Sequence, residues 1–150
     1  MSHTYSQVLL HVVFGTWDRA LMISSEIRDD LYQYMGGIVR EARGTLIAVN
    51  GMPDHVHMLL AMPLTVSIAV LVREVKAKSS RFVHEKWPDR DRFAWQGGYG
   101  VFSVSHSALE QVEKYIREQE EHHRKYSFEQ EFRILLKKHN VAFDERYLWK

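Results

Sequence analysis

The sequence predicts an α+β fold in which helices pack on a mostly antiparallel sheet. Short apolar runs alternate with segments of helical periodicity in the order strand, helix, strand, strand, helix, strand, and two further helices follow. The two middle strands are separated only by the turn-forming residues 50–54 (NGMPD), which lead directly from one strand into the next. The first six elements match the β-α-β-β-α-β order of ferredoxin-like folds. Such folds host many functions, so the function has to be argued from a site.

Each element has a local signal of its own. Residues 8–16 (VLLHVVFGT) are rich in β-branched and apolar side chains and too few for a helix, so we expect a strand buried on both faces. A helix is expected from Ser24 or Ser25 to about residue 43, where Gly44 closes it. The other expected elements are strands 45–49 and 55–62, a helix from Thr65 or Ser67 to about residue 87, a strand at 101–104, a long helix at 109–126 capped by Ser107, and a helix at 128–139.

The composition is that of a globular protein and excludes several kinds of site. The 150 residues are expected to form one domain, residues 1–150, with residues 127–150 as its C-terminal helical extension. The absence of cysteine excludes disulfides, a thiolate nucleophile and Cys-ligated metals, whereas nine histidines are present. The net charge of +1 indicates no partner. No signal-peptide pattern is visible and no apolar run approaches the ~20 residues that span a bilayer, so a cytoplasmic protein is expected.

A histidine pair on an expected strand is the first candidate for a site. Because side chains alternate along a strand, His55 and His57 project from one face while Val56 points the other way, into a core. Two imidazoles on one rigid strand provide the first two ligands of a metal site. Two half-exposed strand histidines that bind no metal would show the same sequence pattern. A metal site therefore needs a third ligand.

The long helix expected at 109–126 offers a third ligand and a nucleophile. Tyr115 and Gln119 are four residues apart, one turn above the other on a flank of the packing stripe. A tyrosine hydroxyl, with a pKa near 10, can attack a phosphodiester when a metal polarises the phosphate. His122, one turn beyond Gln119, is an alternative ligand. A boundary tyrosine followed by an exposed glutamine would show the same pattern.

The second expected helix carries a basic arc. Residues 73–81 (REVKAKSSR) contain four basic residues and one acidic residue, a net charge of +3. The basic side chains lie opposite the apolar stripe or at its edge, which suits a phosphate backbone but is also typical of a solvated face. An aromatic ring in the glycine-rich segment that follows could stack on unpaired bases, whereas Trp95 is expected in the core. The candidate DNA contacts are Arg73, Lys76, Lys78, Arg81 and Tyr99.

Together these segments resemble the IS200-like single-tyrosine HUH transposases, including the relatives associated with repeated palindromic sequences. The resemblance is carried in the family's order by HVVFGTWDR (11–19), MPDHVHMLL (52–60), VKAKSSRFV (75–83), FAWQGGYGVFSV (93–104) and the helix with Tyr115 and Gln119. The PDHVH context followed by Tyr-x-x-x-Gln is more specific than either element alone.

The resemblance implies a metal-dependent enzyme that cuts and rejoins single-stranded DNA. In such an enzyme His55, His57 and Gln119 would bind Mg²⁺ or Mn²⁺, and Tyr115 would form a 5′-phosphotyrosine link and free a 3′-OH. The resemblance also implies recognition of DNA hairpins at the ends of a mobile element. It further implies a homodimer in which the tyrosine helix of one subunit completes the site of the other.

Two other functions would use some of the same residues. A non-catalytic or domesticated protein that regulates a DNA hairpin would need the basic helix and the aromatic residues but no metal, so His57→Ala would leave its binding intact. A metallohydrolase acting on a small phosphoester would use the histidines, with Tyr115 merely structural. Such a hydrolase would keep its turnover in Tyr115→Phe.

Overall fold

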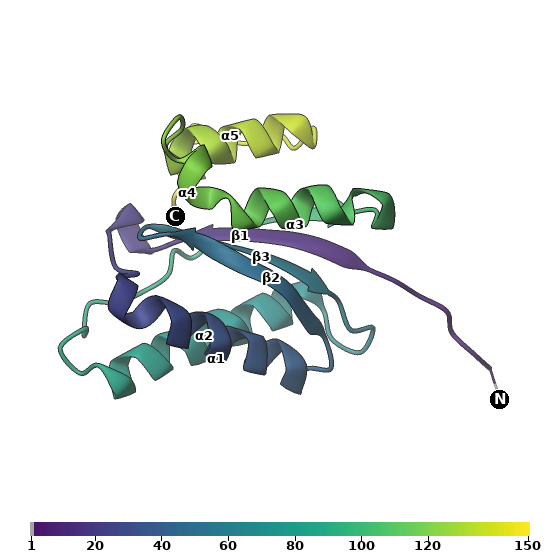
Figure 1. The fold of residues 1–150 in the computed structure, drawn as a ribbon, viewed down its shortest axis with the longest axis horizontal. Coiled ribbons are helices and arrows are strands. Elements are labelled where there is room, and N and C mark those ends of the chain that lie inside the picture. Colours follow the sequence, from purple (N-terminus) through teal and green to yellow (C-terminus); the bar gives the residue numbers. More distant parts are fainter. Residues whose placement is uncertain (1) are drawn as a thin grey trace.

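The computed structural model describes residues 2–150, and its centre is a four-stranded antiparallel sheet (Figure 1). The strands lie side by side in the order β2-β3-β1-β4, so β3 and β1 are the two inner strands. Their bounds are β1 Leu9–Gly15, β2 Thr45–Met52, β3 His55–Ala61 and β4 Gly100–Val104. The helices are α1 Ser25–Glu41, α2 Ile68–Lys86, α3 Leu109–Arg117, α4 Gln119–His122 and α5 Phe128–Lys138, with 3₁₀ turns η1 Trp17–Arg19, η2 His106–Ala108 and η3 Glu145–Tyr147. The predicted α+β class and the β-α-β-β-α-β order are confirmed.

The helices form two layers, one on each face of the sheet. Figure 1 shows α1 and α2 on one face and α3, α4 and α5 on the other. Alternation along β3 places Val56 and Met58 in the core shared with α1 and α2, whereas His55 and His57 face the α3–α5 layer. The site therefore lies between the sheet and the C-terminal helices. No helix within residues 2–150 has the length and apolar character needed to cross a membrane.

The long helix predicted at 109–126 is interrupted, so that prediction is wrong. Helix α3 ends at Arg117, and Glu118 leaves helical geometry with φ −95° and ψ 28° before α4 begins at Gln119. Ser107 does not cap the helix, because η2 precedes α3 and Ala108 is the residue at the cap. The break accompanies the complete burial of Gln119, whose side chain bonds to groups from β3 and α5. Such tertiary contacts override local helix propensity, which alone favoured continuity.

Helix α5 packs directly on the sheet beside the site. Its start is fixed by a capping box, in which Ser127 Oγ accepts from the Gln130 N–H and Gln130 Oε1 accepts from the Ser127 N–H. Phe132 fits against β4 because the facing strand residue is a glycine: a Cβ on Gly100 would lie 2.6 Å from the Phe132 ring. A side chain larger than hydrogen at Gly100 would push α5 away from the sheet.

A matched pair of glycine substitutions tests this close packing. Gly100→Ala is expected to lower the free energy of unfolding by about 1–3 kcal/mol, because the added methyl group overpacks the contact with Phe132. Gly37→Ala lies inside α1, where the nearest atom to the new Cβ is 3.8 Å away, and is expected to raise that free energy by about 0.5–1 kcal/mol. Urea unfolding of both variants measures the difference. Equal effects at the two positions would contradict the packing argument.

Candidate functional site

The two strand histidines form the base of the site. Neither His55 nor His57 has any exposed surface, so the half-exposed alternative is wrong. Each is held on its outer side: His55 Nδ1 donates to Asp54 Oδ1 at 2.6 Å, and His57 Nδ1 lies 2.8 Å from the Nε2 of His11 on β1. These contacts leave both Nε2 atoms directed toward the α3–α5 layer, where a ligand could be shared.

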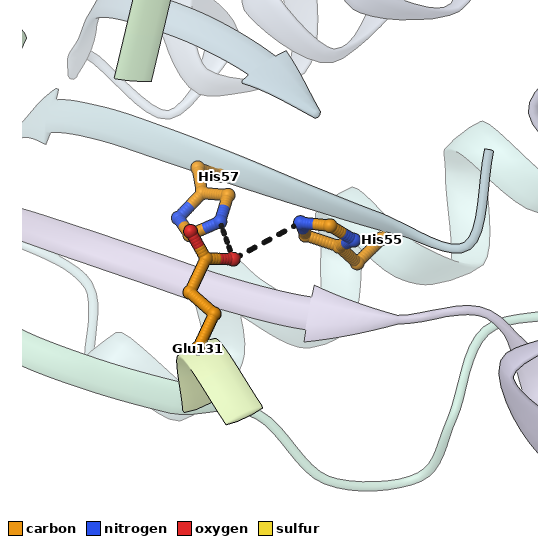
Figure 2. A group of neighbouring side chains, drawn as sticks. All are labelled: His55, His57 and Glu131. Carbon is orange, nitrogen blue, oxygen red and sulfur yellow. Dashed lines mark hydrogen bonds and ion pairs between the residues drawn. The ribbon is translucent and has the colours of Figure 1, made fainter. Parts of the chain in front are cut away.

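Glu131 of α5 completes a cluster that the sequence did not predict. Figure 2 shows its side chain reaching toward His55 and His57 on β3. Its Oε1 lies 2.9 Å from His57 Nε2 and 3.2 Å from His55 Nε2, and the residue is 3% exposed. A carboxylate is rarely buried unless it is paired, and here two imidazoles provide the pairing.

Gln119 and His123 surround the same point. The Gln119 Oε1 is 3.0 Å from His55 Nε2, and the Gln119 Nε2 donates to Glu131 Oε2 at 3.0 Å. His123 Nε2 lies 3.2 Å from Gln119 Oε1 and 3.1 Å from Glu131 Oε1. The structure thus brings the predicted Gln119 next to the histidine pair, although through α4 rather than through one continuous helix. The exposed-glutamine alternative is wrong, because Gln119 is fully buried.

The donor atoms of this cluster fit a divalent metal ion. The ligand atoms of His55, His57 and Glu131 all lie within 4.8 Å of one another. The Glu131 oxygen is 2.9 Å from the His57 nitrogen and 3.2 Å from the His55 nitrogen, close to the ~3.0 Å edge between ligands that sit about 2.1 Å from an octahedral metal. Imidazole nitrogens together with a carboxylate are a common donor set for such ions. The buried His-His-Glu cluster is therefore compatible with a divalent metal site.

Tyr115 meets the cluster from α3. Its hydroxyl donates to Glu131 Oε2, and its ring centroid is 5.9 Å from that of His57. Burial, followed by the Glu131 charge, raises the pKa of Tyr115 far above its usual value of 10. The predicted nucleophile is thus beside its own chain's histidines, but in this arrangement its hydroxyl stays protonated and bound to a carboxylate.

His122 lies next to the tyrosine rather than in the cluster. Its ring stacks on that of Tyr115 with centroids 4.4 Å apart, and its Nε2 is buried without a hydrogen-bond partner. The neighbouring His123, not His122, contacts Gln119 and Glu131. The break between α3 and α4 explains why His123 takes the position predicted for His122, because the residues after Glu118 no longer continue the register of α3.

The charges in the cluster are mutually dependent. Burial alone would raise the pKa of Glu131, but the facing His57 and hydrogen bonds from His123 and His55 hold it well below its usual range. Burial would lower the pKa of His55, yet its bonds to Asp54 and Glu131 outweigh burial and raise it. For His57 burial dominates, and its pKa is lowered despite Glu131. The metal-free site therefore contains an ionised Glu131 that is stabilised mainly by imidazole groups.

The predicted DNA contacts, four on α2 and Tyr99 just before β4, fall into different environments. Lys76 Nζ donates to the backbone carbonyls of Gln96 at 2.9 Å and Gly98 at 2.5 Å, and burial lowers its pKa to about 8. Lys78 Nζ forms ion pairs with Glu74 at 3.3 Å and with a carboxylate on α1. Arg73 and Tyr99 line a pocket of about 360 Å³ together with Lys76. Arg81 is exposed on α2. Trp95 is in the core, as predicted.

Sequence reasoning missed Glu131, His123, His11 and Asp54. The best available signal was in α5, where Glu131 follows Phe128 by three residues and precedes Phe132, so it occupies the buried stripe of an amphipathic helix. A charged residue in such a stripe indicates a buried partner. Asp54 directly precedes His55, and His123 follows Gln119 by four residues, so their closeness in sequence was a further signal. His11 touches the site through the pairing of β1 with β3, which no local pattern shows.

The family model described as "Transposase IS200 like" matches residues 4–119, more than half of the chain. The chain belongs to this family. The matched segment contains His55, His57, Tyr115 and Gln119, whereas α5 and its Glu131 lie beyond it.

Individual relatives agree with this assignment. Over 118 residues the IS200-like chain is 27% identical to the ISDra2 transposase TnpA of Deinococcus radiodurans, covering 75% of this chain and 84% of the relative. It is 26% identical over 124 residues to the transposase for insertion sequence element IS200 of Salmonella typhimurium, covering 79% and 81%. These similarities support membership of a family of DNA-processing enzymes.

Solved structures share the fold. The crystal structure of a putative transposase from Deinococcus radiodurans has a TM-score of 0.64 at 25% identity, covering 79% of this chain and 95% of that chain. The structure of a REP-associated tyrosine transposase bound to a REP hairpin has a TM-score of 0.62 at 13% identity, covering 82% and 73%. The second similarity shows the fold alone.

Proposed function

We propose that this transposase cuts and rejoins single-stranded DNA with Tyr115 as its nucleophile, at hairpin-bearing ends of a mobile element. One observation carries the proposal: the Tyr115 hydroxyl contacts Glu131, the carboxylate that also joins His55 and His57. A candidate nucleophile and a candidate metal site thus meet at one point within a chain of the IS200-like family.

The cleavage step exchanges one ester bond for another. The Tyr115 oxygen bonds to the scissile phosphorus, and the bond from phosphorus to the 3′-oxygen breaks. The tyrosine hydroxyl loses its proton, and the departing oxygen takes one up to become a 3′-OH. Attack by a 3′-OH on the 5′-phosphotyrosine reverses the step and joins strands without an external energy source. Because the Tyr115 hydroxyl is bonded to Glu131, it must give up this contact to reach the phosphate.

The proposed ligands of a divalent metal are His55, His57, Gln119 and Glu131. A bound Mg²⁺ or Mn²⁺ would supply positive charge for the phosphate and the leaving 3′-oxygen. Mixed imidazole and oxygen donors favour Mn²⁺ over Mg²⁺, which prefers oxygen ligands. Asp54 fixes the orientation of His55 from outside the site.

The remaining parts of the proposal rest on the resemblance and on the family. The partner is single-stranded or hairpin DNA, contacted by basic residues of α2, and the protein is cytoplasmic. The chain, residues 127–150 included, acts as one domain. A homodimer with exchanged tyrosine helices stays a prediction. Within one chain, Tyr115 already lies beside His57, so the exchange is not needed to bring these two residues together.

A covalent adduct tests the proposed function. The wild-type protein is incubated with Mn²⁺ and single-stranded DNA from the flanks of its own gene, then denatured and resolved by electrophoresis. We expect a protein–DNA adduct that EDTA abolishes, with mass spectrometry placing the nucleotide on Tyr115. DNA binding without an adduct would favour the regulatory protein instead. An adduct on another residue would show that the nucleophile is misassigned.

A further inference from the structure

A cavity of about 350 Å³ opens beside Tyr115 on the side away from the basic helix. It lies between the end of β4, the α3 helix and the last turn of α5, and His11 of β1 lines it as well. Its volume is within the range of small-ligand pockets, about 300–1,000 Å³. Because the ring of Tyr115 forms part of its wall, anything bound there would touch the proposed nucleophile.

The chemistry of the wall suits a nucleotide. The lining residues include no aspartate or glutamate. Lys138 and the hydroxyls of Ser103 and Ser105 can bind a phosphate, and Val112 and Leu135 offer apolar surface to a base or a sugar. The Tyr115 ring adds an aromatic face. A single-stranded segment combines the same two features, negative phosphates and flat apolar bases.

Of the two lysines at the end of α5, Lys138 lines the cavity. The adjacent Lys137 does not line the cavity. Both lysines are exposed and lie in the last turn of α5.

We propose that this cavity holds the nucleotide next to the scissile phosphate, with Lys138 binding its backbone phosphate. The proposal rests on the proposed function, and it gives α5 a role in binding the substrate. Leu135, Lys138 and His139 lie beyond the family match at 4–119, so the α5 side of this cavity comes from a part of the chain that the family model does not describe.

A charge-reversal pair tests the subsite without relying on catalysis. Binding of a fluorescein-labelled single strand of randomised sequence is measured by anisotropy, without metal, in a Tyr115→Phe background. Lys138→Glu is expected to weaken binding at least tenfold. It should also reduce the slope of log Kd against log salt concentration by about the contribution of one phosphate contact. Lys137→Glu changes the net charge equally and is expected to alter Kd less than about threefold.

The outcomes separate this proposal from the proposed function. Equal weakening by the two variants would show only general electrostatic attraction, and no weakening by Lys138→Glu would remove the lysine from the subsite; either result overturns the proposal. Val112→Phe, which fills the cavity with apolar volume, should also weaken binding, and unchanged binding would count against the cavity itself. If Lys138→Glu acts selectively while wild-type protein forms no adduct with DNA, the cavity binds single-stranded DNA but the catalytic proposal fails, and with it the placement next to a scissile phosphate.

Discussion

The Tyr115→Phe variant is expected to form no covalent adduct with DNA, while its fold and its metal affinity stay close to those of the wild type. The substitution removes only the oxygen that would bond to phosphorus, so the rate of strand cleavage should fall by a factor on the order of 10⁴ or more. The half-buried ring keeps its stacking on His122 and its place beside His57. The cost to stability is the hydroxyl bond to Glu131, about 1.5–3 kcal/mol for a bond to a charged group.

Adduct yield against time measures this prediction, and Tyr126→Phe is its control. Tyr126 is 45% exposed and follows the site helices, so losing its hydroxyl should leave the yield unchanged. Calorimetric titration with Mn²⁺ verifies that the Tyr115 variant still binds metal. An adduct formed by Tyr115→Phe would show that another residue is the nucleophile. Equal losses of adduct yield in the two variants would indicate impaired folding.

The parts of the fold predicted from sequence were those set by local periodicity. Alternation along residues 55–57 was enough to put both imidazoles on one face of the sheet, and helical spacing placed α1 and α2. The break at Glu118 could not be read in this way, because the segment around it has the composition of an ordinary helix. It accompanies contacts of Gln119 with two distant elements, which appear only when the chain is folded.

The site was predicted in part for the same reason. His55, His57, Tyr115 and Gln119 belong to short motifs with fixed spacing, and the structure brings all four together. Glu131 belongs to no such motif, since it enters the site from α5 across 74 residues of sequence from His57. Its position in a buried helical stripe was visible, but the identity of its partner depended on how α5 docks on the sheet.

Replacing Glu131 by alanine is expected to cause the largest loss of stability of any single substitution in the site. Its carboxylate accepts hydrogen bonds from His57, His123, Gln119 and Tyr115, and every one of these donors would lose a buried acceptor. Removing one partner from a buried charged network costs about 3–5 kcal/mol of unfolding free energy. Glu131→Gln keeps the shape and one acceptor oxygen, so its cost should be nearer 1–3 kcal/mol, about that of an imperfectly satisfied polar group.

Urea unfolding of metal-free protein measures these losses, with Glu129→Ala as a control from the same turn of α5. The Glu129 side chain is 41% exposed and pairs with Arg19 at 3.0 Å, so its removal should cost no more than about 1 kcal/mol. Losses of equal size for Glu131→Ala and Glu129→Ala would contradict the network.

Binding of Mn²⁺ to the same variants tests whether the Glu131 carboxylate is a metal ligand. If it is a ligand, as we propose, Mn²⁺ should raise the unfolding midpoint of the wild type and should do so far less in Glu131→Ala, because one of four donors is gone. If the carboxylate only fills the place of the metal, its removal would free the imidazoles of His55 and His57, and the alanine variant would bind Mn²⁺ more tightly than the wild type. Tighter binding would therefore remove Glu131 from the ligand set and make α5 a competitor of the metal. Weaker binding would make the C-terminal helix part of the metal site, although it lies outside the segment that matches the family.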